Sequence, residues 1–145
     1  MTTCTPVLRN SDKNSIILPL RTIESIRDFE ALLHDTDEAV IQFKDFLFKI
    51  GEINPRDNIH RTLSKLFTNE CALNCSWKGI RNNFKVSDLY FIKIMRREIT
   101  LQHSTLTEAG FDNIVAEWLR FAKQRKQREE KGKPAGPEQM TDENN

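Results

Sequence analysis

Apolar residues that recur at intervals of three and four constrain the fold of this chain more than any other feature of its sequence. Such spacing places apolar side chains on one side of an α-helix, whereas a half-buried strand would show alternation. The first stripe of this kind lies in residues 23–34, and Thr22 precedes it as a predicted N-cap. No segment shows sustained alternation, so strands are expected to be absent or minor. The sequence therefore predicts a protein built from amphipathic helices.

Signals for helix ends divide the rest of the chain into further helical segments. The predicted N-caps, in chain order, are Asp35 or Thr36, Asn54 followed by Pro55, Thr68 and Ser87, and a last helix is predicted to start near Thr107. Gly51 is predicted to end the second helix. Residues 76–85 interrupt the helical period and contain Gly79, which predicts a structured loop. The residues predicted to face the core include Phe43, Leu47, Ile59, Leu63, Phe67, Phe91, Met95, Ile99, Phe111, Trp118 and Leu119.

The length of 145 residues fits one domain, and the composition changes at both ends of the chain. Residues 1–15 are polar and aperiodic, and residues 131–145 are rich in Pro, Gly and acidic residues. Both segments are predicted to be disordered tails, because they hold too few apolar residues to pack. The body, residues 16–130, is predicted to be a single all-α domain, a compact bundle of five to six helices.

The sequence contains no apolar stretch that predicts a membrane helix or a secretory signal. The aliphatic run of residues 16–18 is short and is followed at once by Pro19. Cys4, Cys71 and Cys75 are an odd number without the spacing of a disulfide framework, which favours reduced thiols. We therefore expect a protein of the nucleus, or otherwise of the cytoplasm, that has no membrane partner.

No sequence motif predicts an enzyme or a cofactor site. The chain lacks the phosphate-loop, dinucleotide-binding and zinc-protease motifs, and its three histidines predict no catalytic triad. Cys71 and Cys75 lie four residues apart, with His60 upstream, but a fourth metal ligand at standard spacing is missing. Two buried thiols are therefore favoured over a zinc site, and no catalytic activity, cofactor or small-molecule substrate is expected.

Charge is distributed unevenly along the chain, although the net charge is only +1. Residues 55–133 hold 16 Lys and Arg against 9 Asp and Glu, whereas residues 1–54 hold 6 against 9. Residues 134–145 add 3 acidic residues and no basic one. A basic segment of this kind makes a polyanion such as nucleic acid a candidate partner.

Basic residues are concentrated in the predicted loop and in the helix that follows it. Residues 76–97 contain six basic residues and one acidic residue, Asp88. The six are Lys78, Arg81, Lys85, Lys93, Arg96 and Arg97. On a helical wheel the last three form an exposed, locally unpaired strip away from the apolar residues of their helix. These six residues are predicted to bind DNA phosphates, and a solvated surface without a partner is the equally weighted alternative.

The predicted last helix carries a second basic feature. Beyond Ala122 its polar extension is expected to project into solvent, with the basic residues Lys123, Arg125, Lys126, Arg128 and Lys131. The extension is predicted mainly to keep the helix end soluble, and the alternatives are contact with phosphates or a nuclear-import role. The aromatic residues Phe111, Trp118 and Phe121 lie at helical spacing, which indicates core packing more often than contact with another chain.

Residues 63–99 resemble the domain of unknown function 4806 family in a leucine-rich helix, a Trp-x-Gly loop with basic residues, and a following Phe and helix. The residues that carry this resemblance are Leu63, Leu66, Phe67, Thr68, Glu70, Ala72, Leu73, Ser76, Trp77, Gly79, Phe84, Leu89 and Ile92. Residues 20–33 resemble the start of that domain, and residues 116–125 resemble the segment that often follows it. The resemblance implies no catalytic residues.

The same segment is also similar to a BEN domain, in its Leu-x-x-Leu-Phe helix, its glycine loop and its terminal helix. That resemblance implies an α-helical module that binds DNA and chromatin-linked repressors through its last helix and the loop before it. Carried over by position, these contacts fall on the six basic residues named above. Asn82 and Asn83 stand where the first family leads us to expect more basic residues, which lowers the number of phosphate contacts.

The leading prediction is a non-enzymatic nuclear module that binds DNA or chromatin through the loop and the helix. The alternative is a protein-interaction module, or a homodimer that associates through the last helix. In such a homodimer, acidic residues of the first two helices would meet the basic surface of a second copy. Those acidic residues are Asp28, Glu30, Asp35, Asp37 and Glu38.

Overall fold

Seven α-helices make up most of the computed structural model, which describes residues 7–9, 15–51 and 54–132. The helices are α1 (Ile23–Asp35), α2 (Asp37–Ile50), α3 (Pro55–Leu66), α4 (Asn69–Ala72), α5 (Tyr90–Gln102), α6 (Glu108–Arg120) and α7 (Ala122–Gly132). Two small sheets pair β1 (Val7–Arg9) antiparallel with β2 (Ser15–Ile17), and β3 (Cys75–Ser76) parallel with β4 (Phe84–Lys85). The predicted all-α class is confirmed, with strands as a minor component.

Most of the predicted N-caps are confirmed, because short polar side chains accept hydrogen bonds from the first free N–H groups of their helices. For example, Thr22 Oγ1 accepts from the N–H of Ser25 at 3.0 Å. Asn54 Oδ1 accepts from the N–H of Arg56 at 2.8 Å, next to Pro55 in the first turn of α3. The confirmed caps are Thr22, Thr36, Asn54 and Thr68. The predicted start of the last helix near Thr107 is also confirmed, and Thr107 caps α6.

The amino end of α5 differs from the prediction, because Ser87 does not cap it. The helix begins at Tyr90, and Leu89 before it has no side chain that could accept a hydrogen bond. Instead, Glu30 of α1 supplies the cap with both carboxylate oxygens: Oε1 accepts from the N–H of Tyr90 at 2.8 Å and Oε2 from that of Phe91 at 2.9 Å. This acceptor lies 60 residues upstream, so no local pattern near residue 87 could have predicted it.

The two ends of the chain also differ from the prediction. The predicted last helix is two helices, since Phe121 between α6 and α7 has φ −95° and ψ 12°. Residues 7–9, which were assigned to the disordered N-terminal tail, pair with residues 15–17, and α7 extends to Gly132. The rest of the two predicted tails, residues 1–6, 10–14 and 133–145, lies outside the described residues.

An aromatic cluster joins the helices at the centre of the core. The ring of Phe91 on α5 lies 5.0 Å from that of Phe29 on α1, 6.3 Å from Phe43 on α2 and 5.9 Å from Phe67 after α3, measured between centroids. Phe67 in turn lies 6.2 Å from Trp118 on α6. All five residues are buried, so one connected core holds these helices together.

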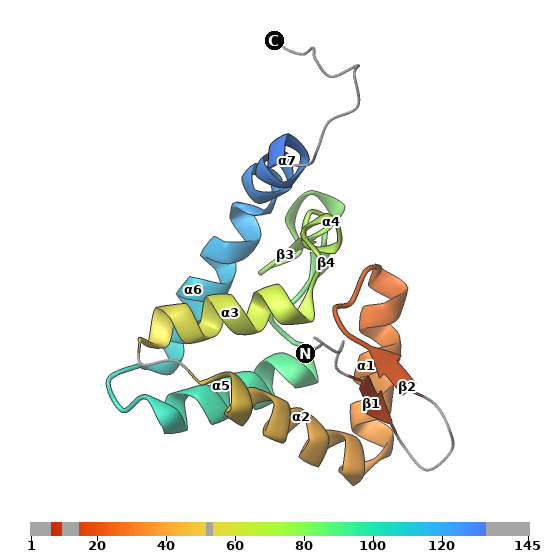
Figure 1. Ribbon diagram of the computed structural model, residues 1–145, viewed down its shortest axis with the longest axis vertical. Helices are drawn as coiled ribbons and strands as arrows, with labels where there is room; N and C mark the ends of the chain where they lie inside the picture. Colours follow the sequence, from red (N-terminus) through yellow and green to blue (C-terminus); the bar gives the residue numbers. More distant parts are fainter. Residues whose placement is uncertain (1–6, 10–14, 52–53, 133–145) are drawn as a thin grey trace.

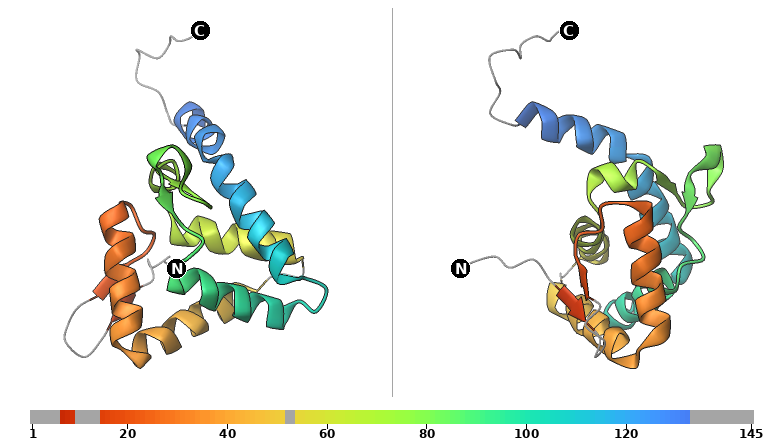
Figure 2. Two further views of the ribbon diagram at one scale, coloured as in Figure 1. Left: turned by 180° about the vertical axis from the view of Figure 1, so that it is seen from behind. Right: turned by 90° about the vertical axis from the view of Figure 1, so that its right-hand side faces the viewer.

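The helices surround this core in pairs. Figure 1 shows α2 and α5 together at the lower side of the molecule and α3 passing α6, and both pairs are in contact. Seen from behind, α5 and α6 lie toward the viewer, and the segment between β3 and β4 projects on that same side (Figure 2). Among the described residues, no helix is long and apolar enough to span a membrane.

The cap provided by Glu30 leads to a stability prediction. We expect Glu30→Ala to lower the free energy of unfolding by about 2 kcal/mol, because two charge-assisted hydrogen bonds and a favourable helix-dipole contact are lost. Thermal and urea unfolding of the full chain, followed by circular dichroism, measure this loss. Asp28→Ala removes an exposed carboxylate from the same helix and is the control. Equal losses for the two variants would show that the cap does not stabilise the fold.

Candidate nucleic-acid interface

The basic loop is closed at its base by hydrogen bonds between its two ends. The N–H of Phe84 donates to the carbonyl of Asn74 at 2.9 Å, and the N–H of Val86 donates to that of Ser76 at 3.1 Å. Within the loop, Ser76 Oγ accepts from the N–H of Ile80 at 3.0 Å. The predicted structured loop is therefore confirmed, and residues 77–83 form a projecting tip on a fixed base (Figure 2).

The tip of this loop has an unusual backbone. Gly79, Arg81 and Asn82 all have positive φ, at 76°, 55° and 63°. Such angles are ordinary for Gly and tolerated by Asn, but for Arg they cost free energy, on the order of 1–3 kcal/mol. A Cβ atom on Gly79 would lie 3.0 Å from Cβ of Lys85, so both the angle and the space favour glycine there. Strained backbone of this kind is concentrated at functional sites more than elsewhere.

Four of the six predicted DNA-binding residues have free charges. Lys78 and Arg81 on the loop, and Lys93 and Arg97 on α5, are exposed. Within the described part of the chain, their side chains have no hydrogen-bond or ion-pair partner. Lys93 and Arg97 are four residues apart and therefore neighbours on one face of the helix.

The other two predicted residues are paired with carboxylates. Lys85 Nζ lies 3.1 Å from Asp88 Oδ2, in an ion pair whose members are both largely exposed. Arg96 Nε lies 2.9 Å from Asp112 Oδ1 on α6, and the guanidinium carbon also lies 5.9 Å from the ring centroid of Phe111. The Arg96 side chain is only 20% exposed, so the expectation of an exposed and unpaired Arg96 is wrong.

Arg96 differs from Lys93 and Arg97 because it lies at the edge of the exposed arc of α5. At that edge a second helix covers it, and α6 places both Asp112 and Phe111 there. Arg96 therefore ties α5 to α6. A wheel of a single helix cannot contain this information, since it shows only the direction of a side chain and not the neighbouring helix.

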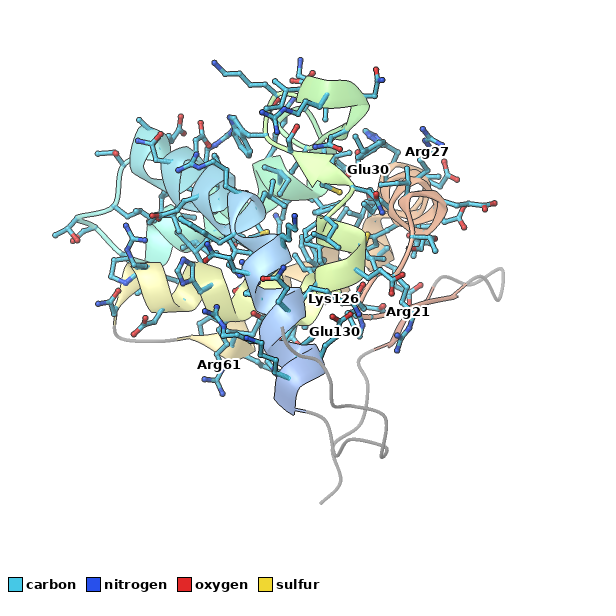
Figure 3. All side chains as sticks on the ribbon, turned by 90° about the horizontal axis from the view of Figure 1, so that it is seen from above. Arg21, Arg27, Glu30, Arg61, Lys126 and Glu130 are labelled. Carbon is cyan, nitrogen blue, oxygen red and sulfur yellow. The ribbon has the colours of Figure 1, made fainter. Side chains whose placement is uncertain are left out.

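Arg27 of α1 is a further cation that sequence reasoning did not place in the interface. Its guanidinium carbon lies 5.5 Å from the ring centroid of Phe84, which is in β4 at the base of the loop. The residue is exposed. Figure 3 shows Arg27 and Glu30 on the same helix. Arg27 therefore extends the basic surface of the loop toward α1, although no local sequence signal links residue 27 to residue 84.

The two cysteines of the body are buried thiols, as predicted. Cys71 and Cys75 are 1% and 3% exposed, and the Cys75 thiol donates to the carbonyl oxygen of Cys71 at 3.5 Å. A side-chain hydrogen bond with the Cys71 thiol, together with burial, raises the pKa of the Cys75 thiol, which disfavours the reactive thiolate. In the described part of the chain, no three His, Cys, Asp or Glu residues form a group that could hold a metal ion.

A groove of about 670 Å³ lies between α7, α4 and the segment that leads into α1. Its charged lining residues are of both signs: Arg21, Arg125 and Lys126 against Glu70 and Glu129. Figure 3 shows Arg21 and Lys126 on this side of the molecule, with Glu130 next to Lys126. The mixed charges do not indicate a particular ligand.

Arg125 on the wall of this groove holds α7 against the body. Its guanidinium carbon lies 3.7 Å from the ring centroid of Trp118, Nη1 donates to the Trp118 carbonyl at 2.6 Å, and Nε donates to Asn69 Oδ1 at 2.8 Å. Burial lowers the pKa of Arg125 to about 10, so the side chain remains charged at neutral pH. The expectation that the whole basic extension projects into solvent is therefore wrong at Arg125, whereas Lys123, Arg128 and Lys131 are exposed.

The aromatic residues of α6 belong mainly to the core. Phe111 and Trp118 are 0% and 4% exposed, which confirms the core assignment, and Phe121 is 42% exposed. Self-association through this stripe would therefore have only Phe121 available as a large apolar contact.

The contacts of Arg125 lead to a prediction about α7. We expect Arg125→Ala to loosen this helix and to speed hydrogen exchange of its backbone amides about tenfold, since a cation–π contact and two hydrogen bonds are lost. Mass spectrometry of peptides from residues 122–132 measures the exchange rate. Lys123→Ala, an exposed change in the same helix, is the control. Unchanged exchange in Arg125→Ala would contradict the proposed role of Arg125.

Comparison with known proteins gives one match. Residues 12–109 match the family described as Domain of unknown function (DUF4806), over a range that contains the loop and α5 and ends in the first turn of α6. No curated protein and no solved structure shows significant similarity to the chain. Because the match covers more than half of the 145 residues, the chain belongs to the DUF4806 family, as the resemblance of residues 63–99 predicted.

Proposed function

We propose that this protein is a non-enzymatic DNA-binding module of the nucleus that holds duplex DNA through the loop between β3 and β4 and through the outer face of α5. The observation that carries the proposal is the set of four exposed cations, Lys78, Arg81, Lys93 and Arg97, that have no partner among the described residues. Cations that are free of carboxylates can neutralise phosphates without first breaking an ion pair.

The shape of the loop also supports the proposal. A projecting loop that carries Lys78 and Arg81 next to Asn82 has the residue types that contact phosphates and base edges in nucleic-acid grooves. Arg81 lies at the tip of the loop, where its side chain is exposed and its backbone is strained. The resemblance to BEN domains points to the same loop and helix, and it stays a prediction.

Pairing changes the number of phosphate contacts that we expect. Arg96 is held by Asp112 between two helices and is removed from the interface. Lys85 is paired with Asp88 at the surface, where such a pair is worth little and can exchange for a phosphate. The proposed interface therefore has four cations at its centre, with Lys85 and Arg27 at its border.

The interface leads to a prediction about salt. We expect the dissociation constant for a 20-base-pair duplex to rise with salt, with log Kd increasing by about 3.6 per tenfold change in salt concentration, because four phosphates are neutralised. Fluorescence anisotropy at two or more salt concentrations measures this slope. Lys93→Ala/Arg97→Ala, and separately Lys78→Ala/Arg81→Ala, are each expected to lower the slope by about 1.8 and to weaken binding at low salt.

A matched control separates this surface from net charge. Lys65→Ala/Lys123→Ala removes the same charge from exposed positions on α3 and α7, outside the proposed interface, and should change binding little. The proposal fails if the unmodified chain does not bind duplex DNA at low salt, or if the control weakens binding as much as the interface variants do. Tighter binding to single-stranded RNA than to duplex DNA would also contradict it.

A further inference from the structure

The outer face of α2 exposes two large apolar side chains opposite the core. Phe43 and Leu47 are buried on the inner face of this helix, whereas Ile41 is 66% exposed and Phe48 is 72% exposed. Ile41 and Phe48 are seven residues apart, which is two helical turns, so they lie on the same outward stripe. Amphipathic surface helices usually have charged or polar residues at such positions.

A third exposed apolar residue lies on the neighbouring helix. Leu101 of α5 is 69% exposed. Its helix is in contact with α2, and Lys44 Nζ lies 3.9 Å from Glu98 Oε2 between the two helices. Among the described residues, Phe48, Leu101 and Ile41 are the most exposed large apolar side chains, and two of the three lie on the outward stripe of α2.

Charges on the stripe indicate what covers it. Lys44 and Asp45 lie between Ile41 and Phe48, and their side chains are 46% and 58% exposed. Each has a surface partner within the chain, Glu98 for Lys44 at 3.9 Å and Lys49 for Asp45 at 3.0 Å, and exposed pairs of this kind are weak enough to exchange for a partner across an interface. The sequence of the stripe is therefore apolar, basic, acidic, apolar. This order is complementary to itself when it is read in the opposite direction, as a two-fold symmetric interface requires.

We propose that the stripe of α2, consisting of Ile41, Lys44, Asp45 and Phe48, binds the same stripe of a second copy of this chain in an antiparallel arrangement. The two-fold axis passes between positions 44 and 45. Ile41 then packs against Phe48 of the second copy, and Lys44 pairs with Asp45 of the second copy. A parallel arrangement would instead place Lys44 against Lys44 and Asp45 against Asp45, and like charges across an interface oppose association.

The surface is small, so the dimer is expected to be weak and dependent on concentration. One helix face buries less area than a typical stable interface, and only two large apolar side chains from each copy contribute to it, on either side of the central charged pairs. The stripe shares no residue with the four cations of the proposed DNA interface. Its test is therefore independent of that proposal.

Sedimentation equilibrium of the full chain, over a range of concentrations without DNA, tests the dimer. The unmodified chain is expected to show a monomer–dimer equilibrium, and Ile41→Gln/Phe48→Gln is expected to weaken it at least tenfold. Ile80→Gln, which replaces an exposed apolar residue of the loop, is the matched control and should leave the equilibrium unchanged. Thermal unfolding of each variant confirms that it is folded, since all three positions are exposed.

Charge reversal tests the antiparallel register. Lys44→Asp alone and Asp45→Lys alone each place like charges across the two-fold axis and are expected to weaken the homodimer. An equimolar mixture of these two single variants is expected to regain association, as is the double variant Lys44→Asp/Asp45→Lys, because opposite charges then face each other. A different protein on this surface would give no such rescue.

Three results would overturn the proposal. The first is a monomer at every concentration, and the second is a dimer that the Ile41→Gln/Phe48→Gln variant leaves unchanged. The third is a dimer that both single charge variants weaken but that neither the mixture nor the double variant restores. The proposed interface would be supported if dimer formation returns both in the mixture and in the double variant, and if Ile41→Gln/Phe48→Gln weakens the dimer.

Discussion

The carboxylate of Glu30 and the ring of Phe91 together hold α5 in place, and the rest of the fold packs around this helix. Glu30 accepts hydrogen bonds from the first N–H groups of α5, and one of these groups belongs to Phe91. The ring of Phe91 then contacts aromatic residues from α1, α2 and the end of α3. With α5 held in this way, Lys93 and Arg97 face outward and Arg96 meets α6.

Local features of this fold could be predicted from the sequence, because the interactions behind them are local. A cap such as Thr22 contacts a residue three positions ahead, and an apolar stripe depends only on helical geometry. The sequence-based predictions of the α5 cap and of a free Arg96 were wrong, because in both cases the hydrogen-bond acceptor is distant in the sequence. Glu30 replaced Ser87 at α5, and Asp112 neutralised Arg96, and both are acceptors from other helices.

The sequence predicted which basic residues belong to the candidate site, but not which of them are paired with carboxylates. The concentration of basic residues in 76–97 is visible in the sequence, and it lies on the loop and α5 as expected. Which of these cations are free depends on carboxylates brought close by folding, so the set of six becomes a set of four. The positive φ of Arg81 was equally hidden, because a long side chain such as that of arginine adopts it only when the surrounding structure enforces it.

The outward stripe of α2 shows a different limit. The apolar pattern predicted that Phe43 and Leu47 face the core, and no prediction was made for Ile41 and Phe48, which the structure exposes on the opposite face. A helical period shows which face is buried within the chain and leaves apolar residues on the other face unexplained. If the chain both binds DNA through the loop and α5 and dimerises through the α2 stripe, one dimer carries two copies of the DNA interface. DNA binding would then have a steeper salt dependence above the concentration at which the chain dimerises, and the slope itself would report the oligomeric state.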